Sequence, residues 1–316
     1  MMKKINDIIG DAKTIGIAGH VRPDGDCMGS CMSLYNYLKK NRPDLDVRVF
    51  LEFVDKKFNI IENTDQIITT GYDGTKFDLF ISLDTASLDR LGLNLPFYEN
   101  AKRTACIDHH ASNDGYADYN YILPKASSAS EVLYDLLDEN LIDKSIAEPM
   151  YMGIAHDSGV FRFQSTTPKT MRIAANMIEK GVNVNMILEE TFFRKTYNQM
   201  MVTAKIQSEA VLALDGKCIY GYCTSEMMEE YGVTTKDLDA VVASIRNVDG
   251  VEVAMFLYQL SEDSYKVSLR SKNYVDVSKI AVENGGGGHV RAAGAEIYGE
   301  LNDIINKLLN RIKQDI

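Results

Sequence analysis

Acidic and imidazole side chains gather at four places in the first half of this chain. These places are His20-Val21-Arg22-Pro23-Asp24-Gly25-Asp26, Asp84, Asp108-His109-His110 and Asp157. Each of the first three follows a short apolar run that predicts a strand, and Asp157 ends a predicted helix. If the strands are parallel neighbours, their carboxyl ends lie at one edge of a sheet, and these side chains converge there.

Carboxylates this close together repel one another strongly at low dielectric unless cations lie between them. Two divalent cations would supply the missing positive charge. Two imidazoles with four or five carboxylates form a mixed nitrogen and oxygen donor set, which suits Mn²⁺ best and also admits Mg²⁺, Co²⁺ or Fe²⁺. The five cysteines lack paired CxxC spacing, so neither structural zinc nor a disulfide framework is indicated.

Each of these residues also has an ordinary structural interpretation when it is taken alone. His20 could be a hydrogen-bonded histidine at a strand end, Asp24 part of a turn, and Asp108 a helix cap. Their combination favours the metal site. His156 precedes Asp157, and we interpret it as a hydrogen-bonded histidine near a helix end rather than as a ligand.

The elements that must position these residues alternate between strands and helices. Predicted strands cover residues 14–19, 47–53, 77–83 and 104–107, and predicted helices cover residues 28–40, 130–140, 145–157, 169–181 and 184–193. The helix near residue 130 is preceded by the capping-box spacing Ser128-x-x-Glu131. The alternation predicts an α/β fold with a mostly parallel sheet covered by helices on both faces.

The pattern changes near residue 195. A helix over residues 197–210 is followed by predicted strands over 211–214, 217–223, 251–260 and 265–271, a run of four glycines, and a closing helix from Leu301. We therefore expect a larger domain over residues 1–194, a linker helix over 195–210, and a smaller α/β domain with a mixed sheet over 211–316.

Composition and charge exclude several classes of function. The chain has 316 residues, with 45 acidic against 34 basic residues and a formal net charge of −11, which is the wrong sign for coating long duplex nucleic acid. The first residues of the sequence include two lysines but lack the apolar segment that a secretory signal peptide would have. The apolar runs elsewhere are too short to cross a bilayer. We expect a cytoplasmic protein without a membrane partner.

Five motifs, in order along almost the whole chain, resemble those of the DHH/DHHA1 phosphoesterases. They are HVRPDGDCMGS from His20, SLDTAS from Ser82, IDHH from Ile107, GIAHDSG from Gly153, and GGGH from Gly286. The two-domain plan resembles the nanoRNase/pAp phosphatase group, which trims very short oligonucleotides and dephosphorylates 3′-phosphoadenosine 5′-phosphate (pAp). An N-terminal DHH domain and a C-terminal DHHA1 domain are implied.

The resemblance implies two sets of metal ligands that share one bridging aspartate. The sets are His20, Asp24 and Asp84 for one metal, and Asp26, Asp84, His109 and Asp157 for the other. Asp108 would orient the histidines, and His110 would contact the scissile phosphate or assist the leaving group. The threonine that the family usually places after the last metal aspartate is replaced here by Ser158.

The glycine run near the C-terminus could be a flexible turn or a phosphate site in which backbone N–H groups face an anion. The resemblance favours the phosphate site. It implies a set of substrate-binding residues, namely Arg270, Ser271, Gly286, Gly287, Gly288 and His289. Arg291 and Lys272 are weaker candidates, and a surface role is equally plausible for each. We expect this site to face the metals across a groove.

The implied reaction is metal-assisted hydrolysis of the 3′-O–P bond in nanoRNA and in pAp. A phosphate held at a fixed distance from the metals would favour short oligonucleotides and nucleoside bisphosphates as partners. A homodimer is implied by the resemblance alone.

Four alternatives rank lower. A cyclic dinucleotide or pApA phosphodiesterase would use the same metals, but the membrane-anchored members carry segments absent here. Inorganic pyrophosphatases lack the GGGH run, and a long-strand exonuclease would need a further domain. A metal-free nucleotide sensor would not need the complete ligand set.

Overall fold

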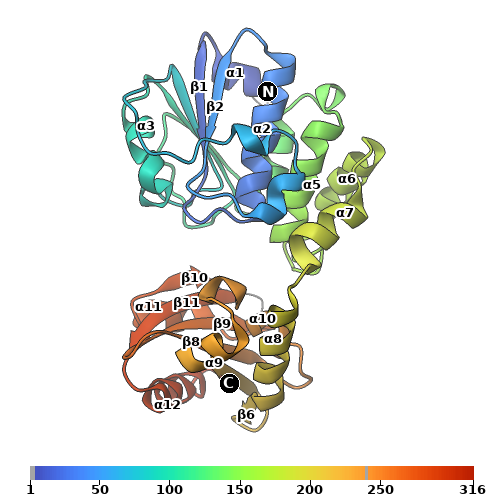
Figure 1. Cartoon of the computed structure of the whole chain (residues 1–316). Coiled ribbons are helices and arrows are strands. Elements are labelled where there is room, and N and C mark those ends of the chain that lie inside the picture. Colours follow the sequence, from blue (N-terminus) through green and yellow to red (C-terminus); the bar gives the residue numbers. More distant parts are fainter. Residues whose placement is uncertain (1–3, 239–240) are drawn as a thin grey trace. The chain divides into compact units, whose positions relative to one another are not determined.

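The computed structural model describes residues 4–238 and 241–316. The chain divides between Arg194 and Lys195 into two compact units, each with its own sheet (Figure 1). Within the described residues, every helix is too short or too polar to span a membrane.

The first unit is built on a five-stranded sheet in which all neighbouring strands are parallel. Its strands are β1 (Thr14–Ala18), β2 (Asp46–Phe50), β3 (Leu79–Leu83), β4 (Thr104–Asp108) and β5 (Tyr119–Ile122), in the order β2-β1-β3-β4-β5. The predicted parallel sheet is confirmed. Strand β5 was not predicted, because its four residues are partly exposed and form no apolar run.

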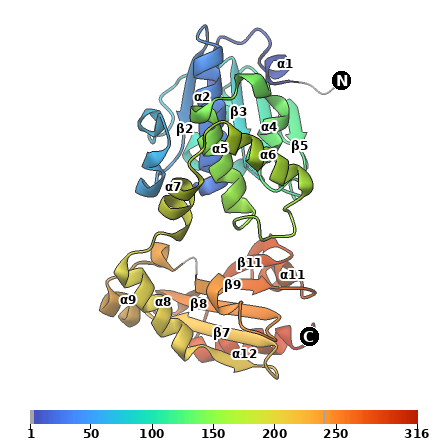
Figure 2. The ribbon, with the colours of Figure 1, turned by 90° about the vertical axis from the view of Figure 1, so that its right-hand side faces the viewer.

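Alternate residues of these strands enter two separate cores. Ile15, Ile17 and Ile81 pack in the larger core, together with helices α1 (Ile5–Ile9), α2 (Gly25–Asn41), α4 (Ala129–Leu136) and α5 (Lys144–Asp157). Phe80 packs in the other, with Phe97 of α3 (Leu95–Glu99) and with the 3-10 segment η3 (Leu88–Asn94). Helices therefore cover both faces, as predicted, although those described on the second face are short. Figure 2 shows α2, α4 and α5 over the first face, and Figure 1 shows α3 on the second.

Helices α2 and α5 lie unusually close together. A Cβ on Gly29 would be 2.5 Å from the carbonyl oxygen of Pro149 and 2.8 Å from the nitrogen of Gly153, so only glycine fits there. This contact fixes the N-terminus of α2 and the C-terminus of α5 in one place.

The remaining helices of the first unit follow α5 along the chain. Helix α6 (Pro168–Glu179) packs on α4 and α5, and α7 (Val184–Leu188) continues into the π-helix η5 (Glu189–Phe193). Three 3-10 segments complete the unit, at η1 (Lys56–Ile60), η2 (Thr64–Gln66) and η4 (Glu139–Leu141).

The second unit contains a six-stranded sheet in the order β10-β11-β9-β8-β7-β6. The strands are β6 (Val211–Ala213), β7 (Cys218–Cys223), β8 (Val253–Ser261), β9 (Ser264–Ser271), β10 (Gly287–His289) and β11 (Ala292–Tyr298). Among the described strands of this unit, only β7 and β8 pair in parallel, so the sheet is mixed, as predicted. Part of the glycine run, which the sequence left open as a flexible turn or a phosphate site, forms strand β10.

Helices pack on both faces of this sheet. They are α8 (Tyr197–Glu209), α9 (Ser225–Tyr231), α10 (Val241–Ile245), α11 (Val277–Glu283) and α12 (Leu301–Ile312), with a 3-10 turn η6 (Thr235–Asp237). Helix α8 lies within the segment expected to be a linker. Its Val202 and Ile206 are buried with Ile219 and Ile245, so it belongs to the core of the second unit.

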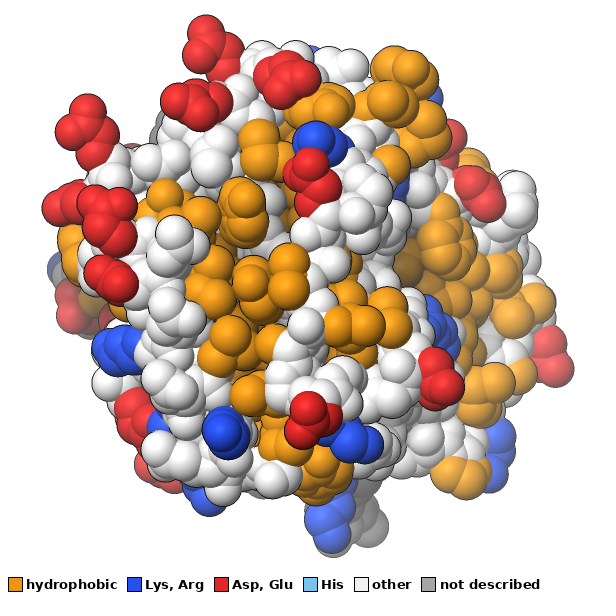
Figure 3. Space-filling model, turned by 90° about the horizontal axis from the view of Figure 1, so that it is seen from below, with side chains coloured by type: hydrophobic (Ala, Val, Ile, Leu, Met, Phe, Trp, Pro, Cys, Tyr) orange, Lys and Arg blue, Asp and Glu red, His pale blue; other side chains and the backbone are white. Residues whose placement is uncertain are grey.

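One face of the molecule carries a concentration of apolar side chains (Figure 3). Among the residues described on that face, lysine and arginine side chains are scattered and form no continuous basic surface.

Candidate metal centre

The predicted ligand residues lie at the ends of neighbouring elements of the first unit. His20 follows β1, Asp84 follows β3 directly, and His109 follows β4 directly. These three strands are adjacent and parallel, so their carboxyl ends meet at one edge of the sheet. Asp24 is the N-cap of α2, Asp26 lies in the first turn of that helix, and Asp157 is the last residue of α5.

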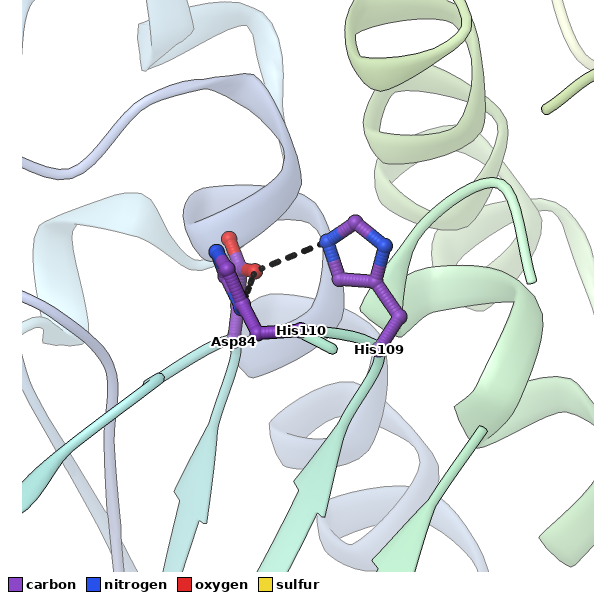
Figure 4. A group of neighbouring side chains, drawn as sticks. All are labelled: Asp84, His109 and His110. Atoms are coloured by element: carbon purple, nitrogen blue, oxygen red, sulfur yellow. Dashed lines mark ion pairs between the residues drawn. The ribbon is translucent and has the colours of Figure 1, made fainter. Parts of the chain in front are cut away.

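The structure brings the donor atoms together in three overlapping groups, each with its atoms within 4.8 Å of one another. The groups are His20, Asp24 and Asp84; Asp26, His109 and Asp157; and Asp84, His109 and His110. Asp84 Oδ2 is 3.4 Å from His20 Nε2. Asp84 Oδ1 faces the two other histidines, with His109 Nε2 at 3.5 Å (Figure 4). One carboxylate thus faces both sides of the site, and the mixed donor set fits two divalent cations such as Mn²⁺.

Asp84 adopts a backbone conformation that L residues rarely occupy. Its φ is +52°, it is 3 % exposed, and its N–H donates to the carbonyl of Ile107 at 3.2 Å. Strain of this kind persists only where the surroundings impose it, and it is concentrated at functional sites.

Asp26 is fully buried and is held by the N-terminus of α4. Its Oδ2 accepts the N–H of Ala129 at 2.6 Å and its Oδ1 accepts the N–H of Ser130 at 3.0 Å. Burial raises the pKa of Asp26 well above its ordinary value, and the negative charges of Asp84 and Asp157 raise it further. The carboxylate form therefore needs nearby cations.

Imidazoles supply positive charge to the cluster. Burial lowers the pKa of His109, but its ion pairs with Asp157 and Asp84 outweigh burial and raise the pKa to about 12. Burial raises the pKa of Asp157 to about 6 although His109 opposes the change. Burial also acts to raise the pKa of Asp84, yet hydrogen bonds with His109 and His20 hold it well below the ordinary range. Bound divalent cations would replace these protons, since a ligating imidazole is neutral.

Asp108 lies beside the three groups of donor atoms, and it orients His110. The Nδ1 of His110 is 2.8 Å from Asp108 Oδ1, and Asp108 is fully buried. Asn113, which the sequence analysis missed, donates from Nδ2 to Asp108 Oδ2 at 2.7 Å and to the carbonyl of Thr85 at 3.1 Å. The one sequence signal for Asn113 was its position, three residues after His110.

Arg90 was also missed. Its Nη2 is 3.3 Å from His20 Nδ1, and its carbonyl accepts the N–H of Val21 at 2.7 Å. His20 Nδ1 is 2.8 Å from the carbonyl of Val21, which suits a proton on Nδ1 and leaves Nε2 for a metal. With that tautomer Arg90 is a neighbouring cation and not a hydrogen-bond partner of Nδ1, because a guanidinium only donates. Local sequence offers no signal for this contact, because Arg90 follows Asp84 in a segment without regular periodicity.

The substrate-binding residues expected in the second unit fall into two sets. Arg270 on β9 and His289 on β10 are both register partners of Ala292 on β11, so all three lie in one row across the sheet. Ser268, Gly294 and Gly287 form the next row on the same face. The floor between the Arg270 and His289 side chains is therefore formed by small residues.

Glycine is required at two positions of the expected phosphate site. A Cβ on Gly286 would be 2.1 Å from the carbonyl oxygen of Gly294, and one on Gly288, at φ +140°, would be 2.5 Å from that of Ala292. Close packing against β11 explains these residues, while a Cβ on Gly287 would meet open space.

Three candidate residues of the second unit donate side-chain hydrogen bonds to backbone carbonyls of that unit. Ser271 was expected to bind substrate, but it is buried on the opposite face from Arg270, and its hydroxyl donates to the carbonyl of Val275 at 2.7 Å. Lys272 donates to the carbonyl of Val248 and Arg291 to that of Val275. These contacts give Lys272 and Arg291 a structural role.

Comparisons with known proteins agree with this architecture. Residues 14–154 match the family model for the DHH family N-terminal domain, and residues 215–315 match that for the DHHA1 domain. Over 313 residues the chain is 31% identical to the bifunctional oligoribonuclease and PAP phosphatase NrnA of Thermus thermophilus, covering 96% of this chain and 90% of that protein. The Bacillus subtilis protein of the same name is 28% identical over 290 residues, with 90% of each chain covered.

A solved structure shares the fold. The crystal structure of an exopolyphosphatase-related protein from Bacteroides fragilis superposes with a TM-score of 0.89 at 23% identity, covering 98% of this chain and 95% of that one.

Proposed function

Because the chain belongs to the DHH/DHHA1 family of metal-dependent phosphoesterases, we propose that it hydrolyses the 3′-O–P bond of very short oligoribonucleotides and of pAp with Mn²⁺. As a member of this family it is a hydrolase of phosphoester bonds. Both proposed activities appear in the names of its T. thermophilus and B. subtilis relatives. The observation that carries the proposal is Asp84, whose two oxygens face two separate ligand groups.

We assign the two metals to the groups described above. His20, Asp24 and Asp84 would hold one cation, and Asp26, Asp84, His109 and Asp157 would hold the other. Bound cations of this kind lower the pKa of water to produce a nucleophile near neutral pH and stabilise charge on phosphoryl oxygens. Mn²⁺ is preferred because the donors mix imidazole nitrogen with carboxylate oxygen.

His110 would serve the leaving group. Its Nδ1 is engaged by Asp108, so Nε2 is the atom that can contact the substrate. A proton on Nε2 would pass to the 3′-oxygen as the bond between that oxygen and phosphorus breaks. Asp108, held by Asn113, would keep the ring in the required orientation.

The second unit would bind the 5′-phosphate of the substrate. Arg270 and His289 flank Ala292 on one sheet face and can both donate to a phosphate. The N–H of Gly286 already donates to the carbonyl of Ala281 at 2.8 Å, so a backbone donor to the phosphate would have to come from Gly287 or Gly288. A 5′-phosphorylated dinucleotide and pAp share both a 5′-phosphate and a 3′-O–P bond, so one site would serve both.

Purified protein supplied with Mn²⁺ should be assayed against pAp, pApA, a cyclic dinucleotide and pyrophosphate. We expect turnover of pAp and pApA, with release of AMP from both, and no turnover by Asp84→Asn. Cleavage of pyrophosphate alone would overturn the proposal. Preference for the cyclic dinucleotide would favour the phosphodiesterase alternative.

A further inference from the structure

His156 is an imidazole in the first unit that belongs to none of the ligand groups found among the described residues. It lies in the last turn of α5, directly before Asp157. Two contacts connect it to segments distant in sequence, and neither is explained by metal binding or by the proposed hydrolysis.

The first contact is with Gly25, the residue between Asp24 and Asp26. A Cβ on Gly25 would lie 2.1 Å from His156 Cγ and 2.3 Å from His156 Nδ1. The ring therefore rests directly against the Cα of Gly25, and no other residue type could accept it there. The backbone segment that carries the proposed ligands Asp24 and Asp26 is thus packed against His156, the residue directly before the proposed ligand Asp157.

The second contact is with Thr191 in the π-helix η5. His156 Nε2 is 2.9 Å from Thr191 Oγ1, and the same hydroxyl donates to the carbonyl of Ile187 at 2.7 Å. Since the hydroxyl has one hydrogen, its oxygen accepts a hydrogen bond from Nε2–H. This bond fixes both the tautomer and the tilt of the ring. Aromatic rings of Phe58 and Phe192 lie 6.0 and 5.3 Å away, centroid to centroid.

We propose that His156 is a positioning residue for the metal centre. Its ring holds Gly25 against the end of α5, and the hydrogen bond that His156 Nε2–H donates to Thr191 Oγ1 fixes the ring in place. The inference rests on the proposed function, because it concerns the same two metals.

The physical reason is preorganisation. Asp24, Asp26 and Asp157 repel one another until cations bind, so the backbone between Asp24 and Asp26 must be held against that repulsion. A backbone fixed beforehand binds metal more tightly, because less order has to be imposed on binding. Residues that orient metal ligands typically contribute a factor of 10 to 100 in metal affinity.

The test is a titration of Mn²⁺ into metal-stripped full-length protein, in which calorimetry measures the Kd. Thr191→Val removes the acceptor for Nε2–H, and Thr191→Ser keeps it. We expect the Kd for Mn²⁺ to rise about 10-fold in Thr191→Val and to stay near the wild-type value in Thr191→Ser. The kcat for pAp at saturating Mn²⁺ should recover toward wild type, while the Mn²⁺ concentration needed for half activity rises.

Thr203→Val is the matched control. Thr203 lies in α8 of the second unit and its hydroxyl donates to the carbonyl of Gln199 at 2.6 Å, the same bond to the fourth preceding residue that Thr191 makes. This variant should leave the Kd unchanged. Melting curves in chelator would show whether each variant is folded.

A folded Thr191→Val variant with the wild-type Kd would overturn the inference. Should that variant not fold, His156→Gln decides, because it keeps an N–H donor but has no ring against Gly25: a raised Kd supports the clamp and an unchanged Kd overturns it. Failure of the proposed function looks different, since the wild-type protein itself would then bind no pair of Mn²⁺ ions or hydrolyse no pAp.

Discussion

The carboxylate of Asp26 accepts the backbone N–H of Ala129 at 2.6 Å, across 103 positions of sequence. A proposed metal ligand is thereby attached to the first turn of another helix, where the partial positive charge of the helix N-terminus favours an anion. Ligand orientation in this site therefore depends on backbone groups as well as on side chains.

Replacing Asn113 with Leu should lower kcat with little effect on Mn²⁺ binding. The change removes the Nδ2 donor to Asp108 Oδ2 and so loosens the carboxylate that orients His110. We expect kcat for pAp to fall about 10- to 100-fold at saturating Mn²⁺. Asn120→Ala, on the exposed part of β5, is the control. An unchanged kcat in Asn113→Leu would contradict the proposal that Asn113 holds Asp108 and that Asp108 in turn orients His110.

Arg270→Ala and His289→Ala should each raise KM for substrates that carry a 5′-phosphate. A hydrogen bond to a charged group contributes about 1.5 to 3 kcal/mol, so KM for pApA should rise about 10- to 100-fold. The comparison substrate is ApA, which lacks the 5′-phosphate. In steady-state kinetics, KM for ApA should differ little between the wild type and the variants. Equal effects on both dinucleotides would contradict the phosphate assignment.

Glu252→Gln should destabilise the second unit in a pH-dependent way. Glu252 is 2 % exposed and accepts the N–H groups of Asn273, Tyr274 and Val275. Burial acts to raise the pKa of this carboxyl, but those hydrogen bonds outweigh it and hold the pKa below the ordinary 4.5. The variant should lower the free energy of unfolding at pH 7 by about 1 to 3 kcal/mol.

The sign of the pH effect follows from the depressed pKa. A carboxyl with a lowered pKa in the folded state stabilises the protein fully above the unfolded pKa and loses that contribution as pH falls through the folded pKa. Urea unfolding should therefore show a large difference between wild type and variant at pH 7 and a smaller one below pH 4.5. A difference that grows on acidification would contradict this account.

Gly29→Ala should weaken both the fold and metal binding. The added methyl group would meet backbone atoms of Pro149 and Gly153, which cannot move aside cheaply. Overpacking of this kind costs about 1 to 3 kcal/mol, and parting α2 from α5 separates Asp26 from Asp157. Thermal melting and Mn²⁺ titration measure the two effects. Gly71→Ala, with no atom closer than 3.9 Å, should change neither.

The sequence predicted the parts of the fold that depend on local pattern. Apolar runs ending in acids identified the strands that precede Asp84 and His109, and parallel pairing then brought those residues together. Strands β5, β10 and β11 were not predicted. Strand β5 is short and half-exposed, two of the three residues of β10 are glycine, and β11 begins with Ala-Ala-Gly-Ala, residue types that are depleted in strands.

The contacts that orient the ligands could not be predicted. The bond between Asp26 and Ala129 joins distant segments, and many pairings would satisfy the same local pattern. The left-handed backbone of Asp84 is imposed by its surroundings rather than by aspartate itself. Ser271 was misassigned because its neighbour Arg270 suggested the site, while strand alternation turns the two side chains to opposite faces.

Anomalous diffraction at the manganese edge, on crystals of the protein grown with Mn²⁺, measures the metal centre directly. We expect two peaks per chain on either side of Asp84, one beside His20 and Asp24 and the other beside Asp26, His109 and Asp157, and loss of at least one peak in Asp84→Asn. A single peak that Asp84 does not contact, or no peak at this edge of the sheet, would contradict the two-metal account.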